Sequence, residues 1–159
     1  MEKKATPPSG YPELKSLGVS AAKNKGLYKF NKPNQLLLET FSIPPSKLRG
    51  YYHDGNNKNN LEITINANEF TCCCPITGQP DYGKIKVVYA PHGLCLESKS
   101  LKLYLMGYRN YGSFHETVVT MIGDHLIEVL KPRYLFVTGI FDARGGISFH
   151  PTYEWHSRR

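Results

Sequence analysis

The stretch that decides the fold is SKSLKLYLMGYRNYGSFHETVVTMIGDHLIEVLKP, residues 98–132, in which apolar side chains recur at helical spacing. A first helix is predicted from Ser98, with side chains at i, i+3, i+4 and i+7 on one face: Leu101, Tyr104, Leu105 and Tyr108. Glycines within 107–112 end this helix. A second helix is predicted over about 114–130, ending before a proline, with an inward face made by Val118, Ile122, Leu126 and Val129.

Strand patterns flank this helical pair on both sides. Apolar residues alternate with polar ones from Leu61 to Ile65 and again from Lys84 to Tyr89, which predicts two half-buried strands. After the helices, the runs RYLFVTGIFDA (133–143) and GGISFHP (145–151) predict a closing hairpin split by two glycines. The order strand, strand, helix, helix, strand, strand lacks βαβ alternation. It therefore predicts an α+β fold, an antiparallel four-stranded sheet with two helices on one face. The two sheet edges lack partners, so we expect an oligomer.

Composition limits the class of protein. The chain has 159 residues and a net charge of +7, with 40% hydrophobic residues, which is typical of one globular domain. Residues 1–59 carry ten Lys and Arg against four Asp and Glu, so the basicity belongs mainly to the N-terminal part. We interpret 1–26 as a flexible basic arm and 27–159 as a single catalytic domain, with QLLLETFSIPP (35–45) as an ordered connection. No membrane segment, no secretory signal and no direct nucleic-acid contact are expected, and the expected location is cytoplasmic.

Three of the four cysteines lie together in TCCCPITGQPD, residues 71–81, and three interpretations compete. Structural zinc sites use separated cysteine pairs, and no histidine shows metal spacing with these thiols, so no metal site is expected. Adjacent cysteines form strained disulfides, and the cytoplasm keeps thiols reduced. The third interpretation is a nucleophilic thiol, Cys74, which a tight turn at Gly78 and Pro80 would bring toward Asp81. The loop alone leaves open whether these cysteines are reactive or merely small core residues.

Several further segments carry a resemblance to a known family. EFTCCCPITGQPD (69–81), LESKSLKLYL (96–105) and FHE (114–116) resemble, in order and spacing, the QueF-type NADPH-dependent 7-cyano-7-deazaguanine (preQ0) reductases of queuosine biosynthesis, in their single-module form. RGGI (144–147) and LLLETF (36–41) are also similar to that family. The resemblance covers roughly residues 37 to 152 and leaves out the N-terminal arm.

The resemblance implies a tunnelling fold, in which the small sheets of several subunits join into a barrel. It implies a homo-oligomer with active sites at subunit interfaces, and a reaction that reduces the nitrile of preQ0 to the primary amine of preQ1. By similarity, Cys74 is the nucleophile that forms a thioimidate, Asp81 is the proton donor, and His115 lies beside them as a catalytic and substrate-binding residue. Cys72 and Cys73 depart from the family pattern and receive no role.

The resemblance also implies the substrate-binding residues. It assigns Glu116 to the purine ring, with His115 beside it, and Leu96, Glu97 and Ser98 to a second contact. A carboxylate suits this role because it accepts two hydrogen bonds from a guanine-like edge. From the residues alone, Glu97 and Ser98 could equally cap the first helix, and Glu116 could simply favour the first turn of the second.

NADPH is the implied cofactor, and the resemblance assigns to it Ser98, Lys99, Lys102, Arg144 and Gly145. No G-x-G-x-x-G follows a strand, so the site is not of the Rossmann type. From the residues alone, the lysines could equally form a solvated helix face and the glycine a hairpin turn. Two other functions remain as alternatives: an amidinotransferase that makes archaeosine from preQ0 in tRNA, and a purine-binding module without turnover. The intact ESKSLKLY segment favours the reductase.

Overall fold

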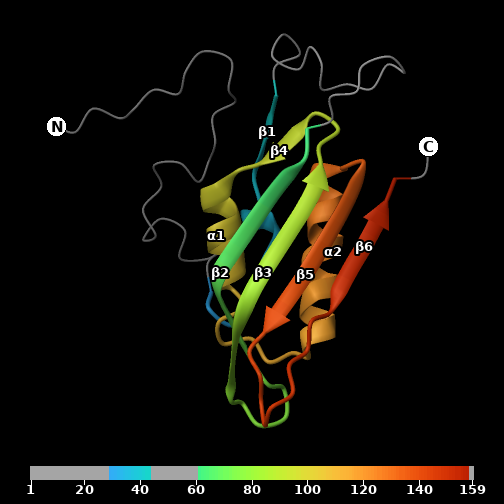
Figure 1. Ribbon diagram of the computed structural model, residues 1–159. Coiled ribbons are helices and arrows are strands. Elements are labelled where there is room, and N and C mark those ends of the chain that lie inside the picture. Colours follow the sequence, from blue (N-terminus) through green and yellow to red (C-terminus); the bar gives the residue numbers. More distant parts are fainter. Residues whose placement is uncertain (1–28, 44–60, 158–159) are drawn as a thin grey trace, which may run out of the picture.

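The computed structural model describes residues 29–43 and 61–157 (Figure 1). Four antiparallel strands form the main sheet in the order β2-β3-β5-β6, and both helices lie behind one of its faces (Figure 1). The bounds are β2 (Ile63–Cys73), β3 (Pro80–Ala90), β5 (Tyr134–Phe141), β6 (Thr152–His156), α1 (Ser98–Met106) and α2 (His115–Leu130). The predicted α+β class is confirmed. The predicted arm over 1–26 lies outside the described residues.

Alternation along the strands separates the core from the outer face of the sheet. On β3, Ile85, Val87 and Tyr89 are buried, whereas Lys84 and Lys86 between them are exposed. The same alternation continues on β5, where Leu135, Val137 and Phe141 are buried. Successive strand residues point to opposite faces, so one face of the sheet packs against the helices and the other faces away from them.

The two helices present the apolar faces that their spacing predicts. Leu101, Tyr104 and Tyr108 of the first face are buried, and Leu105 is half-buried. On α2 the buried residues are Val118, Val119, Ile122, Gly123, Leu126 and Leu130. Val129, predicted to point inward, is only half-buried, because it lies at the edge of the buried stripe that runs through Leu126 and Leu130. Among the described residues, neither helix combines the length and apolarity needed to cross a bilayer.

A second, smaller sheet was not predicted. It pairs β1 (Thr40–Ser42) with β4 (Leu94–Leu96), and η1 (Gln35–Leu37) precedes it. The expected ordered connection over 35–45 is therefore present as far as residue 43. The rest of it lies outside the described residues, which resume at 61. Strands of three residues are too short to show a period of two, so their pairing could not be found from sequence.

The predicted closing hairpin is present as β5 and β6, but its second strand does not lie within 145–151 as predicted. That strand, β6, begins at Thr152, and the residues before it form an irregular connection from β5. Gly145 and Gly146 both have positive φ, 58° and 82°, and the backbones of Arg144 and Ile147 hydrogen-bond across them. After this left-handed turn the chain returns to β5, since Gly139 N donates to Pro151 O and Phe141 N donates to Phe149 O. Arg144 in the turn contacts Asp81, near the point where β2 turns into β3.

Candidate active site

The cysteine stretch continues β2 and then turns sharply. The strand runs through Cys73, and the backbone N–H of Cys74 donates to Gln79 O at 2.8 Å. The N–H of Gly78 donates back to Cys74 O at 3.0 Å, with a positive φ of 69° that glycine adopts without strain. Both backbone groups of Cys74 are thus bonded within the turn, so the hairpin fixes the backbone from which its side chain projects.

Strand register places Asp81 beside this turn. Asp81 is the second residue of β3 and pairs directly with Cys72 of β2. The predicted turn at Gly78 and Pro80 is therefore present, although Asp81 lies opposite Cys72 rather than opposite Cys74. Asp81 is only 5% exposed, and a buried carboxylate needs charged or hydrogen-bonding partners.

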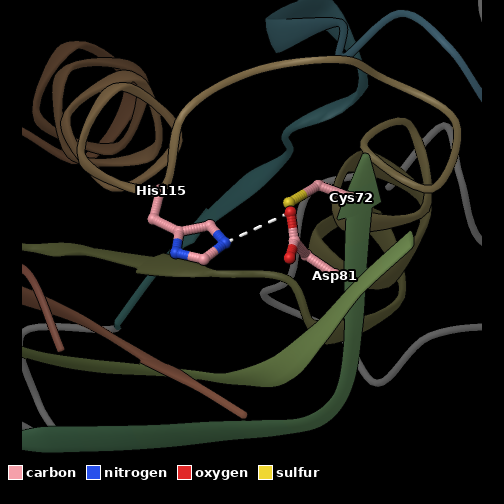
Figure 2. A group of neighbouring side chains, drawn as sticks. All are labelled: Cys72, Asp81 and His115. Atoms are coloured by element: carbon pink, nitrogen blue, oxygen red, sulfur yellow. Dashed lines mark ion pairs between the residues drawn. The ribbon is translucent and has the colours of Figure 1, made fainter. Parts of the chain in front are cut away.

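His115 is the first of these partners, and Figure 2 shows it reaching Asp81 from the start of α2. Its Nε2 lies 3.3 Å from Asp81 Oδ2. The imidazole ring stacks on Phe141 with a centroid distance of 3.7 Å and an interplanar angle of 5°. The loop before α2 is tied to β2, because Cys73 N donates to Tyr111 O and Ser113 N donates to Cys73 O, each at 3.0 Å. These bonds fix the start of α2 against the cysteine strand.

Arg144 is the second partner of Asp81. Its guanidinium contacts Asp81 Oδ1 from the turn that follows β5. Arg144 is 44% exposed, so the ion pair joins a buried carboxylate to a side chain that remains open to solvent. The resemblance assigns this arginine to NADPH, but within one chain its guanidinium contacts Asp81, the predicted proton donor.

A cavity of about 320 Å³ opens over these groups. It brings together the predicted residues Cys74, Asp81, His115, Glu116 and Arg144, which come from four separate segments of the chain. Apolar side chains complete the lining: Pro75, Phe114, Ile147 and Phe149. Phe114, Ile147 and Phe149 are each more than half exposed, so the mouth of the cavity is apolar and its floor is charged.

The three adjacent thiols have different chemical environments. The pKa of Cys74 is lowered to about 7, chiefly by hydrogen bonds from the Thr77 side chain and backbone, with a smaller contribution from Arg144. Burial raises the pKa of Cys72 to about 12, and the nearby Asp81 carboxylate raises it further. Cys73 points elsewhere, with its Sγ 3.6 Å from Arg109 O. Of these cysteines, Cys74 combines partial exposure with a substantial thiolate fraction near neutral pH.

The second predicted substrate segment lies elsewhere in the chain. Glu97 is buried and caps α1, accepting hydrogen bonds from Lys99 N at 2.8 Å and Ser100 N at 2.6 Å. Leu96 N donates to Tyr89 Oη at 3.0 Å, so this segment is fixed near the far end of β3. Tyr89 and Asp81 are separated by roughly 27 Å of strand at about 3.4 Å per residue. Leu96, Glu97 and Ser98 are therefore not brought to the cavity that holds Cys74.

Ser98 and Lys102 line a second cavity of about 530 Å³ between α1 and β2. Its floor is apolar, with Leu101 and Leu105, and its rim adds Arg109, a cation that the sequence reading missed. Lys99 is half-buried near the start of the same helix and does not line this cavity. The residues predicted for the cofactor therefore do not all lie at one cavity. Arg144 lines the first cavity, and Gly145 follows it in the turn after β5.

Two residues near Cys74 were missed by sequence reasoning. Cys72 lies beside Asp81 because the two are directly paired residues of β2 and β3, and this strand register was not predicted from the sequence. Thr77 gave no signal, because its bond to the sulfur depends on how the turn folds back. Both follow from local geometry rather than from a motif.

Comparison with known proteins identifies the family. A family model described as QueF-like protein matches residues 80–159. A protein of Streptococcus thermophilus is 56% identical over 115 residues, covering 72% of this chain and 70% of its own length. The chain belongs to the QueF-like protein family. The Streptococcus relative is named NADPH-dependent 7-cyano-7-deazaguanine reductase.

Other QueF-like relatives extend the match. A Helicobacter pylori protein of the same name is 45% identical over 140 residues, covering 88% of this chain and 84% of that protein. Among solved structures, the apo form of an archaeosine synthase described as QueF-Like has a TM-score of 0.58 at 20% identity. It covers 64% of this chain and 100% of that one. At this identity the match supports the fold alone.

Proposed function

We propose that this chain is an NADPH-dependent nitrile reductase that converts preQ0 to preQ1 through a covalent thioimidate on Cys74. The observation that carries the proposal is the meeting of Cys74 and Asp81 at one cavity, in a chain 56% identical to a reductase of that name. Their roles as nucleophile and proton donor remain parts of the proposal.

The chemistry follows from the environment of each group. The Cys74 thiolate adds to the nitrile carbon, and the electron pair of one C–N π bond moves to nitrogen. Asp81 passes to this nitrogen the proton that the Cys74 thiol has given up, which gives a neutral thioimidate. Arg144 stabilises the thiolate before attack, and His115 holds the Asp81 carboxylate in place. With the substrate seated over the cavity, its apolar mouth would shield the reacting carbon from water, which protects an imine from hydrolysis.

Substrate recognition is assigned to the mouth of the same cavity. Glu116 lies in the first turn of α2 and lines the cavity, where its carboxylate can accept two hydrogen bonds from a guanine-like edge. Phe114 and Phe149 offer apolar surface for a flat ring. The charged floor then lies beneath the ring, where the nitrile has to reach.

The residues of the second cavity fit a phosphorylated cofactor. Lys102 and Arg109 supply positive charge, and Leu101 and Leu105 supply apolar surface for an aromatic ring. Ser98 and Lys99, at the N-terminal end of α1, add a hydroxyl group and a further cation. When bound, NADPH supplies the hydride equivalents that carry the nitrile to the amine. Gly145 lies in the turn beside the first cavity and lines neither of the two cavities.

A homo-oligomer with interfacial active sites follows from this division. Glu97 lies just before α1, near the end of β3 that holds Tyr89, whereas Cys74 lies where β2 turns into β3. No molecule of purine size spans that separation. Among the described strands, β2 and β6 each lack a neighbour on one side. Pairing of such edges would join copies into the barrel of a tunnelling fold and bring the α1 segment of one chain to the cavity of the next.

We further assign residues 27–159 to a single catalytic domain that works in the cytoplasm. All four cysteines are free thiols, which is typical of a reducing compartment.

Turnover and adduct formation test the reaction. Purified protein mixed with preQ0 should consume two NADPH per nitrile. The consumption is measured as the loss of the absorbance of reduced nicotinamide. Without NADPH, the intact mass should increase by that of preQ0, and Cys74→Ala should abolish the increase while Cys73→Ser preserves it. Formation of an amidine without consumption of NADPH would show the amidinotransferase instead, and binding without any adduct would show a purine-binding module.

Mixed oligomers test the interface. Cys74→Ala and Lys102→Glu should each be inactive alone, because one lacks the nucleophile and the other a cofactor cation. If sites combine segments from two chains, co-refolded equal mixtures should regain about 25% of wild-type activity, since a quarter of the interfaces pair two intact segments. Absence of any recovery, with mixed oligomers verified by mass, would place both segments in one chain.

A further inference from the structure

Three side chains of different chemistry converge beneath the candidate active site (Figure 2). The Cys72 sulfur, an Asp81 carboxylate oxygen and a His115 ring nitrogen all lie within 4.8 Å of one another. Cys72 is 0% exposed and Asp81 is 5% exposed. A thiol, a carboxylate and an imidazole are the donor types that proteins use for zinc.

The spacing of these atoms is close to that of a tetrahedral metal site. Zinc lies about 2.0–2.3 Å from N, O and S ligands, so neighbouring ligands at tetrahedral angles are about 3.3–3.7 Å apart. The distance between His115 Nε2 and Asp81 Oδ2 is 3.3 Å, already one edge of such a tetrahedron. The remaining pairs lie within 4.8 Å, so small side-chain rotations complete the set.

The fold holds the three ligands in place before any ion arrives. Cys72 and Asp81 are directly paired residues of β2 and β3, and both point to the helix side of the sheet. The His115 ring is fixed by its stacking on Phe141 at 3.7 Å. Ligands fixed in this way lose little conformational entropy on binding, which favours affinity.

We propose that Cys72, Asp81 and His115 form a binding site for Zn²⁺ or an ion of similar softness, and that the occupied site blocks turnover. A thiolate and an imidazole favour zinc over Mg²⁺ and Ca²⁺, which prefer oxygen ligands. Three protein ligands leave a fourth position for water from the cavity that Asp81 and His115 line. Within the described residues, these three side chains form the group of metal-binding donors whose ligand atoms all lie within 4.8 Å of one another.

Charge balance is compatible with binding. The ion displaces the proton of Cys72 to solvent, and the resulting thiolate and the Asp81 carboxylate together neutralise a divalent charge. Arg144 competes with the ion for Asp81, because both are cations that bind the same carboxylate. The arginine is 44% exposed, so it can turn into solvent. Removing this competing cation should therefore increase metal affinity.

Inhibition follows from the identity of the ligands. Asp81 and His115 are committed to the ion, so the proposed proton donor is lost although Cys74 is not a ligand. Only this consequence rests on the proposed reductase function. Metal binding itself can be measured without turnover.

Cobalt spectroscopy tests the site directly. Co²⁺ added to metal-free full-length protein should give a near-ultraviolet thiolate charge-transfer band and visible bands of tetrahedral intensity. Cys72→Ser should lose the charge-transfer band, while Cys73→Ser, whose thiol points away, should keep it. Cys74→Ala should also keep it. Loss of the band in Cys74→Ala with retention in Cys72→Ser would overturn the proposal, because the ion would then be held by the nucleophile. Circular dichroism establishes that each variant is folded, and Cys72→Ala provides a second variant at the same position.

Zinc inhibition tests the consequence. The activity of each variant with Zn²⁺ is divided by its own activity with a chelator, which cancels any change in basal rate. Cys72→Ser should need at least about 100-fold more zinc for half inhibition than wild type, since a ligand is lost. Equal sensitivity of the two proteins would overturn the inhibitory role. If the protein shows no reductase activity at all, the proposed function fails, and the cobalt spectra still decide whether the site exists.

Discussion

Arg144 contacts Asp81, so the turn that follows β5 is connected by an ion pair to the second residue of β3. The same guanidinium helps to lower the pKa of Cys74. One cation therefore acts on both residues that the proposed mechanism requires. The nucleophile is activated by groups on two loops that meet at one end of the sheet.

Replacing Arg144 should reduce the reactivity of Cys74 at neutral pH. The thiol pKa is about 7, so about half of it is thiolate at pH 7. In Arg144→Ala the pKa rises, and alkylation by iodoacetamide at pH 7 should slow by about two- to fivefold. Arg144→Lys keeps the charge and should retain most of the rate. Unchanged alkylation in Arg144→Ala would show that the arginine does not stabilise the thiolate.

Removing the Thr77 hydroxyl should have a larger effect, because its hydrogen bond is the main cause of the lowered Cys74 pKa. Thr77→Val keeps the shape of the side chain, and Thr77→Ser keeps the donor. The midpoint of the alkylation rate against pH should move upward in Thr77→Val and stay near 7 in Thr77→Ser. If the alkylation midpoint of Thr77→Val lay at a lower pH than that of Arg144→Ala, the arginine and not the threonine would be the main cause of the lowered Cys74 pKa.

Shortening Glu97 should destabilise the fold. Its carboxylate caps α1 through two backbone N–H groups and is 6% exposed. Glu97→Ala should lower the free energy of unfolding by about 1–2 kcal/mol, read from the urea midpoint. Lys102→Ala lies on an exposed position of the same helix and should change stability by less than about 0.5 kcal/mol. Equal effects of the two variants would argue against the cap.

Glu116 should matter for substrate rather than for cofactor. Glu116→Ala should weaken preQ0 binding by about 10- to 100-fold, the cost of losing charge-assisted hydrogen bonds, with little change for NADPH. Calorimetry of both ligands provides the measurement. Glu128→Ala, on the exposed side of α2 near Gln35, is the matched control and should leave both affinities unchanged. Comparable losses for both ligands in Glu116→Ala would contradict an anchoring role.

Sequence periodicity predicted the helices and the main strands because burial repeats along them. Leu101, Tyr104 and Ile122 show the helical period, and Ile85 and Val87 show that of a strand. It could not predict β1 and β4, whose three residues contain no full period, nor the late start of β6. The latter depends on two glycines with positive φ, and glycine occurs as readily in hairpins of other geometry.

The candidate site was only partly predictable for a related reason. Motifs predicted Cys74, Asp81 and His115, and the structure places all three around one cavity. The contact between Arg144 and Asp81 joins residues from separate hairpins, and no spacing in the chain predicts it. The same holds for Cys72 and His115, because the path from β2 to α2 runs through a loop whose course depends on tertiary contacts.

The double backbone bond of Cys73 has a consequence for how this region opens. Its N–H and C=O both bond to the segment 111–113, so the strand that ends at the nucleophile and the segment that begins α2 share hydrogen bonds. Amide exchange at Cys73 and Ser113 then requires one common opening, and the two should be protected to the same degree as a single foldon. Opening of the segment before α2 therefore also breaks the hydrogen bonds that hold the β2–β3 hairpin at Cys73.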